Sequence, residues 1–188
     1  VATDQGDVVA RLTSQIAGGT EFIVPMGERA DPQTVQFGNH VDTEPVGVLA
    51  WEATRIASGI PRIGLDTDAR TIPNEIGLYA THLDKGCYRG QETVARVHNL
   101  GRPPRRLTML MLDGSDAELP DPGASVILEG RKVGQLGGVA MHHELGPVGL
   151  ALLKRNVSVD AVPTVDGVAA SQTILVDPEV GLHVRPQL

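Results

Sequence analysis

Apolar residues in the first quarter of the chain recur at an even interval and then gather in a short run. Three of them stand four positions apart, namely Val8, Leu12 and Ile16. This interval, with two glycines directly after it, predicts a short amphipathic helix over residues 7–17. The apolar run within residues 21–25 predicts a buried strand, and the polar stretch 26–45, with its prolines and glycines, predicts a loop.

A second helical pattern covers residues 46–58, and a shorter one follows it. We expect Gly59 and Pro61 to end the first of these helices. Four of its apolar side chains are expected to face a core: Val48, Leu49, Ile56 and Ala57. Pro73 can open a short helix with Glu75 in its first turn, where a carboxylate meets unpaired backbone N–H groups.

From residue 107 onward the pattern changes to short, strand-like runs that glycine and proline separate. The runs cover residues 107–112, 126–128, 133–140, 148–153 and 171–176, and residues 129–132 look like a hairpin turn. Short strands at this close spacing predict a small antiparallel barrel or sandwich. Residues 100–104, Leu-Gly-Arg-Pro-Pro, break any continuing element. We therefore expect an α+β chain with two parts, residues 1–101 and 102–188.

Composition narrows the classes of function. The 188 residues include one cysteine, which excludes an intrachain disulfide and a metal site built from several cysteines, so we expect no metal bound by this chain alone. Only five aromatic side chains are present, too few for a platform on which nucleic-acid bases stack, and tight binding of nucleic acid is not expected. No run approaches the ~20 apolar residues of a membrane-spanning helix. These features are typical of a cytoplasmic protein.

The charge is concentrated in one segment. The formal net charge is −7, yet residues 85–106 hold six bases and one acid, Glu92, while the flanking regions are acidic. Such a run can be a solvated surface loop, or it can be a site for an anion such as a carboxylate or a phosphate.

The basic segment begins with a motif that brackets the only thiol between two glycines. It reads Lys85-Gly86-Cys87-Tyr88-Arg89-Gly90-Gln91-Glu92. Glycine allows positive φ and the close approach of a ligand. Cations two residues before and after a cysteine favour its reactive thiolate form. From the residues alone, Cys87 is either such a reactive thiol or a buried, inert one. Gln91 and Glu92 are either hydrogen-bonding groups of a site or the start of a helix.

The motif closely resembles the signature of the YgfZ family of folate-binding proteins, which are relatives of the glycine-cleavage T protein, an aminomethyltransferase. The family also includes a mitochondrial iron–sulfur assembly factor. The resemblance continues through Thr93-Val94-Ala95-Arg96, and upstream it includes Glu52-x-x-Arg55-Ile56-x-x-Gly59-x-Pro61 and Pro73-x-Glu75. It implies the end of a folate-binding α/β region in residues 1–101 and a C-terminal β-barrel in residues 102–188. The family's folate-binding region is much longer than this one, so we expect the chain to be the C-terminal half of a longer protein, with its N-terminal half as a partner.

The resemblance also implies roles for individual residues. Cys87 would be the reactive thiol, and Lys85 and Arg89 would tune it or guide an anion. The implied contacts to tetrahydrofolate, or to a one-carbon derivative of it, are Arg55, Glu75, Tyr88, Gln91 and Glu92, with Gly86 and Gly90 shaping the loop. Arg55 matches an arginine that holds the glutamyl carboxylate of folate in the T protein, and a guanidinium fork suits a carboxylate. The residues leave two alternatives open, in which Arg55 pairs with Glu52 on a helix and Tyr88 packs in a core.

Three functions follow as hypotheses. The resemblance implies a tetrahydrofolate-binding accessory protein that supports the assembly or repair of iron–sulfur clusters in client proteins, and that takes part in tRNA modification. An alternative is a folate-dependent one-carbon transferase of the aminomethyltransferase type. The third is a docking module that uses its basic segment to hold RNA or a partner protein.

Overall fold

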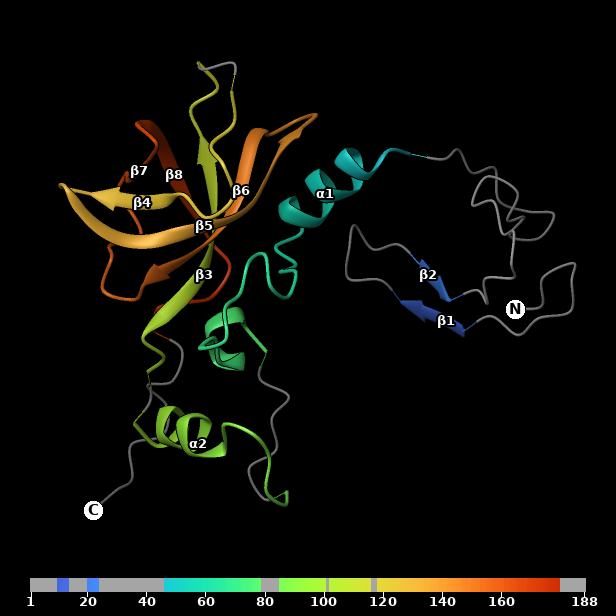
Figure 1. Cartoon of the computed structure of the whole chain (residues 1–188), viewed down its shortest axis with the longest axis vertical. Helices are drawn as coiled ribbons and strands as arrows, with labels where there is room; N and C mark the ends of the chain where they lie inside the picture. Colours follow the sequence, from blue (N-terminus) through green and yellow to red (C-terminus); the bar gives the residue numbers. More distant parts are fainter. Residues whose placement is uncertain are drawn as a thin grey trace, which may run out of the picture.

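A computed structural model describes residues 10–13, 20–23, 46–78, 85–100, 102–115 and 118–179 (Figure 1). The largest element is a closed barrel of six antiparallel strands in the order β3-β6-β5-β4-β7-β8. These strands are β3 (Arg105–Leu112), β4 (Ser125–Leu128), β5 (Arg131–His142), β6 (Gly146–Lys154), β7 (Thr164–Val165) and β8 (Val168–Ile174). The antiparallel barrel expected for the second half of the chain is therefore confirmed.

Tight hairpins join neighbouring strands of the barrel. Glu129 and Gly130 have φ values of 50° and 74° and form a two-residue turn between paired Leu128 and Arg131. Positive φ at both central positions matches the right-handed twist of the flanking strands, which confirms the expected hairpin. Asp166 and Gly167, with φ values of 49° and 89°, make the same kind of turn between β7 and β8.

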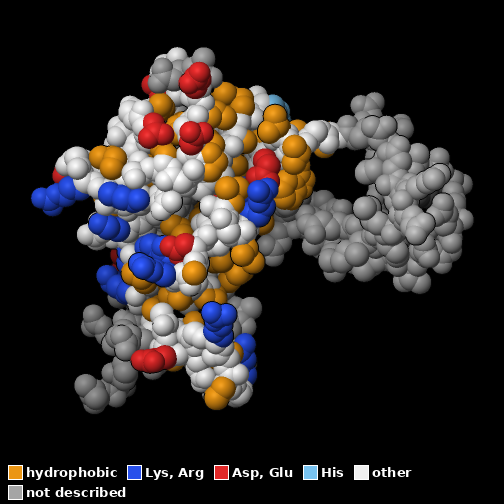
Figure 2. All heavy atoms as spheres, in the orientation of Figure 1, with side chains coloured by type: hydrophobic (Ala, Val, Ile, Leu, Met, Phe, Trp, Pro, Cys, Tyr) orange, Lys and Arg blue, Asp and Glu red, His pale blue; other side chains and the backbone are white. Residues whose placement is uncertain are grey.

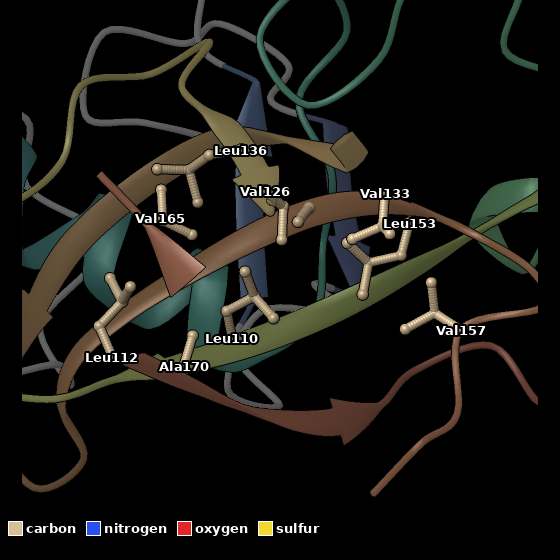
Figure 3. Close-up of a cluster of buried hydrophobic side chains, with 10 residues drawn as sticks. Leu110, Leu112, Val126, Val133, Leu136, Leu153, Val157, Val165 and Ala170 are labelled. Carbon is tan, nitrogen blue, oxygen red and sulfur yellow. The ribbon is translucent and has the colours of Figure 1, made fainter. Parts of the chain in front are cut away.

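Two layers of apolar side chains lie on the two sides of the barrel wall. The inner layer fills the barrel, and Figure 3 shows its side chains converging from strands on all sides. The outer layer lies beneath the helix α1 (Val48–Ala57) and consists of Ala53, Ile56, Leu107, Met109, Ala140, Val148, Leu150, Leu152 and Val176. Alternation along the strands sends neighbouring residues to opposite faces, so one set of strands supports both layers.

The helix α1 is confirmed, but the side that it buries differs in part from the expectation. Ala53 and Ile56 are buried against the barrel, whereas Val48 and Leu49 are 68% and 78% exposed. The prediction was wrong for Val48 and Leu49 because the barrel contacts the later turns of the helix. Gly59, with φ of 70°, follows the last turn, as predicted.

The remaining described elements are short. The 3₁₀-helix η2 (Pro73–Ile76) begins at the expected proline, and the helix α2 (Gln91–Leu100) begins at the last two residues of the motif. The strands β1 (Ala10–Thr13) and β2 (Thr20–Ile23) pair antiparallel. The helix predicted over residues 7–17 is therefore wrong at Ala10–Thr13. The strand predicted over 21–25 is confirmed up to Ile23, and the loop predicted over 26–45 lies outside the described residues.

The described part of the chain is mostly β, with a six-stranded antiparallel barrel and few helices. None of the helices in this part is long and apolar enough to cross a membrane. The helix α2 ends at Leu100 and β3 begins at Arg105, on either side of the predicted boundary. The division into residues 1–101 and 102–188 stays a prediction.

Candidate functional site

The motif forms an exposed loop that leads into α2. Gly90 has φ of 81°, a left-handed conformation that favours glycine, and its carbonyl accepts a hydrogen bond from the Val94 N–H. The Gln91 N–H donates to the carbonyl of Tyr88 at 3.2 Å. The expectation that Gln91 and Glu92 start a helix is therefore confirmed, and the loop places residues 85–89 immediately before it.

The thiol of the motif is open to solvent. Cys87 is exposed, and so are its neighbours Lys85, Gly86 and Arg89. The buried, inert thiol that the sequence left open as an alternative is therefore not present. An exposed thiol between two exposed cations can meet a soluble reaction partner, in particular an anionic one. Its reactivity stays a prediction.

The side chains of Lys85 and Tyr88 contact each other within the loop. The ammonium group of Lys85 lies 4.5 Å from the centre of the Tyr88 ring, a cation–π contact. The Tyr88 side chain is half-buried, and its hydroxyl oxygen is buried without a hydrogen-bond partner in the described structure. A buried hydroxyl with no partner costs about 1–3 kcal/mol, so a group that bonded to it on binding would be favoured.

We expect Cys87 to react with thiol reagents in the folded protein. One thiol per chain should be labelled without denaturant, and the negatively charged reagent dithionitrobenzoate should react faster than the neutral reagent dithiodipyridine, relative to free cysteine. Replacing Lys85 and Arg89 by glutamine should reduce this preference by about two- to fivefold at low salt, because attraction of the anion is lost. Labelling only after addition of urea would contradict the exposed thiol.

A second cluster joins Glu75 of η2 to Arg105 of β3. The fully buried Glu75 carboxylate accepts hydrogen bonds from Arg105 Nε at 2.8 Å and Nη2 at 2.9 Å. Arg105 also donates to both carboxylate oxygens of Asp68. Hydrogen bonds from Arg105 hold the pKa of the Asp68 carboxyl well below its usual range, and those to Glu75 and Asp68 raise the pKa of Arg105. This cluster fastens residues 68–75 to the barrel.

A third cluster surrounds Arg55 and is almost completely buried. Arg55 is 1% exposed and donates from Nε and Nη2 to Glu52 and from Nη1 to Asp66 at 2.8 Å. Its Nη1 also bonds to the carbonyl of Ile60 at 2.5 Å. Asp66 in turn accepts the backbone N–H of Arg62 at 2.7 Å and that of Gly138 at 2.5 Å. The alternative in which Arg55 pairs with Glu52 is confirmed, although the pair is buried rather than on the surface.

The structure therefore brings the predicted site residues together in three places. One place is the motif loop with Lys85, Gly86, Cys87, Tyr88, Arg89, Gly90, Gln91 and Glu92, and the other two hold Glu75 and Arg55. The roles of Arg55, Glu75, Tyr88, Gln91 and Glu92 as folate contacts stay predictions. Within the described ranges, no group of three His, Cys, Asp or Glu side chains could hold a metal ion.

Two charged partners of Arg55 and Glu75 were not identified from the sequence. Asp66 pairs with Arg55 and Arg105 pairs with Glu75, while Gly138 and Asp68 bond in turn to Asp66 and Arg105. One signal was available: the adjacent glycines 137 and 138 stand inside a strand pattern, which indicates a bulge or the close approach of another segment. The pairing of β5 with β6 does shift between Leu136 and Val139, and Asp66 approaches at this shift.

Known proteins resemble part of the chain, although no family model matches it. "Putative transferase At1g60990, chloroplastic" of Arabidopsis thaliana is 37% identical over 93 residues, which make up 49% of this chain and 21% of the relative. The tRNA-modifying protein YgfZ of Colwellia psychrerythraea is 36% identical over 80 residues, and that of Escherichia coli is 37% identical over 82 residues. These matches cover 41% and 42% of this chain and 24% of each relative. Over somewhat less than half of its length, the chain is thus homologous to the YgfZ proteins.

Proposed function

We propose that the chain acts as part of a tetrahydrofolate-binding accessory protein of the YgfZ kind, which supports the assembly or repair of iron–sulfur clusters. The observation that carries the proposal is the motif loop, in which Cys87 is exposed directly before α2. The relatives named tRNA-modifying protein support an extension to tRNA modification. Client iron–sulfur proteins and a cytoplasmic location belong to the same proposal.

Some of the residues expected to contact a folate are available for hydrogen bonds to a ligand, and others are not. Tyr88 offers a buried hydroxyl without a partner, and Gln91 beside it is half-buried, so both have hydrogen-bonding capacity for a ligand. Arg55 and Glu75 are buried, and their charges are occupied by Asp66 and Arg105. These two residues are therefore better suited to holding the loop of residues 60–76 in place than to touching a ligand directly.

The folate and the motif loop would supply different parts of the chemistry. A bound tetrahydrofolate supplies carriage of a one-carbon group. Cys87 supplies an exposed thiol, and the exposed cations Lys85 and Arg89 favour the approach of an anion to it. We assign Tyr88 and Gln91 to binding, Cys87 to the reacting position, and Gly90 to the turn that sets this loop against α2.

Tetrahydrofolate binding by the intact protein tests this proposal. Isothermal titration calorimetry under anaerobic conditions would compare the wild type with Tyr88→Phe, which removes only the hydroxyl. We expect Tyr88→Phe to weaken binding by about tenfold, as the loss of one buried hydrogen bond does. Cys87→Ala should bind normally but fail to restore iron–sulfur enzyme activity in cells that lack the gene. Absence of affinity for any tetrahydrofolate species would overturn the proposal.

A one-carbon transferase is the second candidate, and the name of the Arabidopsis relative favours it. An assay for methylenetetrahydrofolate formed from an aminomethyl donor distinguishes the two. Turnover with an intact donor protein would replace the accessory role by an enzymatic one, and its absence beside normal folate binding would support the accessory role.

A further inference from the structure

A cleft of about 950 Å³ lies away from the motif, between the loop of residues 63–70 and the outer side of the barrel. The loop forms one wall, and residues 132–137 of β5 form the other. Leu152 and Lys154 of β6 and Arg105 of β3 also line it. A volume of this size lies within the range of about 300–1,000 Å³ that small-molecule sites occupy.

One end of the cleft carries a row of cations on three neighbouring strands. Arg105 of β3 is the register partner of Lys154 of β6, and the pairing of Gly134 with Leu153 places Lys132 of β5 within one residue of the same level. Adjacent strands are about 4.8 Å apart, so these three side chains start close together. Figure 2 shows lysine and arginine side chains gathered on the side of the barrel where β4 and β5 meet.

The acidic groups of the cleft neutralise Arg105 but leave its lysines unpaired. Asp66 is buried against Arg55, and Asp68 is held by Arg105 through two hydrogen bonds. By contrast, Lys132 and Lys154 are exposed and make no ion pair within the described ranges. Arg70 of the loop is likewise exposed, and its side chain makes no ion pair there. The cleft therefore presents three unpaired cations from three separate segments of the chain.

The arrangement of these cations indicates the class of anion. A carboxylate is planar, carries one charge, and is best met by a single guanidinium fork. A phosphoryl group carries nearly two charges and three outward oxygens, which suit point charges that arrive from different directions. The loop wall of the cleft also carries an apolar surface. Ile63 is 91% exposed there, and Leu65 stands two residues later.

We propose that this cleft binds a small phosphorylated molecule, with Arg70, Lys132 and Lys154 around the phosphate and Ile63 against its apolar part. The site is separate from the motif loop, and it needs neither folate nor Cys87. Arg105 is held by Glu75 and Asp68, whose two charges outweigh its own, so we assign it no role in attracting the phosphate.

Titration calorimetry of the folded chain tests the proposal with three probes: phenyl phosphate, inorganic phosphate and benzoate. We expect saturable binding of phenyl phosphate, weaker binding of inorganic phosphate, and at least tenfold weaker binding of benzoate. Lys132→Gln and Lys154→Gln should each raise the dissociation constant for phenyl phosphate by about tenfold, the effect of losing one charge-assisted hydrogen bond. Ile63→Ser should remove the advantage of phenyl phosphate over inorganic phosphate.

Arg131→Gln is the matched control, because Arg131 is exposed in the same hairpin, loses the same charge and does not line the cleft. It should change the dissociation constant by less than twofold. All four substituted side chains are exposed, so circular dichroism should show that the four variants remain folded. Equal weakening by Arg131→Gln would reduce the effect to general charge and overturn the site. Equal binding of benzoate, or no saturable binding of any probe, would overturn it as well.

Discussion

Asp66→Asn is expected to lower the free energy of unfolding by about 3–5 kcal/mol. This is the cost of removing one charge of a buried ion pair and leaving the other without that partner. The Asp66 side chain is completely buried, and the side chain of Arg55 opposite it is 2% exposed. Both carboxylate oxygens of Asp66 accept hydrogen bonds, one from Gly138 and the other from Arg55 and Arg62. Either orientation of an asparagine amide would therefore point its NH₂ group at a donor. Size is almost unchanged, so the loss is electrostatic.

Urea denaturation, followed by circular dichroism, measures this change. Asp68→Asn is the control, because it makes the same chemical change two residues later in the same loop. The Asp68 side chain is 51% exposed, and an exposed pair contributes about 0–1 kcal/mol. A loss of stability in Asp66→Asn no larger than that in Asp68→Asn would contradict the anchoring role that we assign to the buried pair.

This difference bears on the cleft, because Asp66 and Asp68 both belong to its loop wall. Asp66 fixes the loop to the bulge of β5, and Asp68 with Glu75 fixes the following residues to Arg105. The two attachments use separate arginines on α1 and β3. A loop held at both points keeps Ile63 and Arg70 in position without burying either of them.

The barrel could be predicted from the sequence because its signals are local. Alternating apolar residues and glycine turns repeat at short intervals along the chain. Most strands pair with a strand adjacent to them in the sequence, and β3 pairs with β8 where the barrel closes. The short strand β7 lacks such a run and was not predicted, although the Asp166-Gly167 pair after it is a strong hairpin signal. Turn chemistry therefore holds information that the apolar pattern lacks.

The helix predicted over residues 7–17 shows where periodicity is ambiguous. An interval of four places residues on one face of a helix, but it is also an even number, so it places them on one face of a strand. Leu12 lies in β1, which pairs with β2. For Val48 and Leu49 the pattern predicted the helix correctly. It did not show which turns of that helix the barrel would cover.

The candidate site divides in the same way. The motif could be recognised because its eight residues are contiguous, and the structure keeps them in one loop and helix start. The charge partners of Arg55 and Glu75 could not, since Asp66 is 11 residues from Arg55 and Arg105 is 30 from Glu75. Only the fold brings such pairs together. Among the bases of the basic segment, Arg105 is structural, whereas Lys85 and Arg89 stay exposed.

Gly137→Ala is the second large effect that we expect, at about 3 kcal/mol, the upper end of the cost of overpacking. A Cβ atom at this position would lie 2.7 Å from the Asp66 Cα and 3.1 Å from its Cγ. A backbone atom cannot move aside as the end of a flexible side chain can. The φ angle of Gly137 is not in the left-handed region, so the expected cost is steric.

Gly114→Ala is the control for this substitution. Its Cβ would meet only Pro147 at 3.5 Å, an ordinary contact, so stability should change by about 0.5 kcal/mol or less. The double variant Asp66→Asn with Gly137→Ala gives the sharper result. If the methyl group pushes the loop off β5, the buried pair is already disturbed, and the two losses should fall short of additivity by about 1 kcal/mol or more. Strict additivity would mean that the bulge of β5 and the Asp66 carboxylate stabilise the loop independently. That result would contradict their direct contact, in which the backbone N–H of Gly138 donates to one carboxylate oxygen of Asp66.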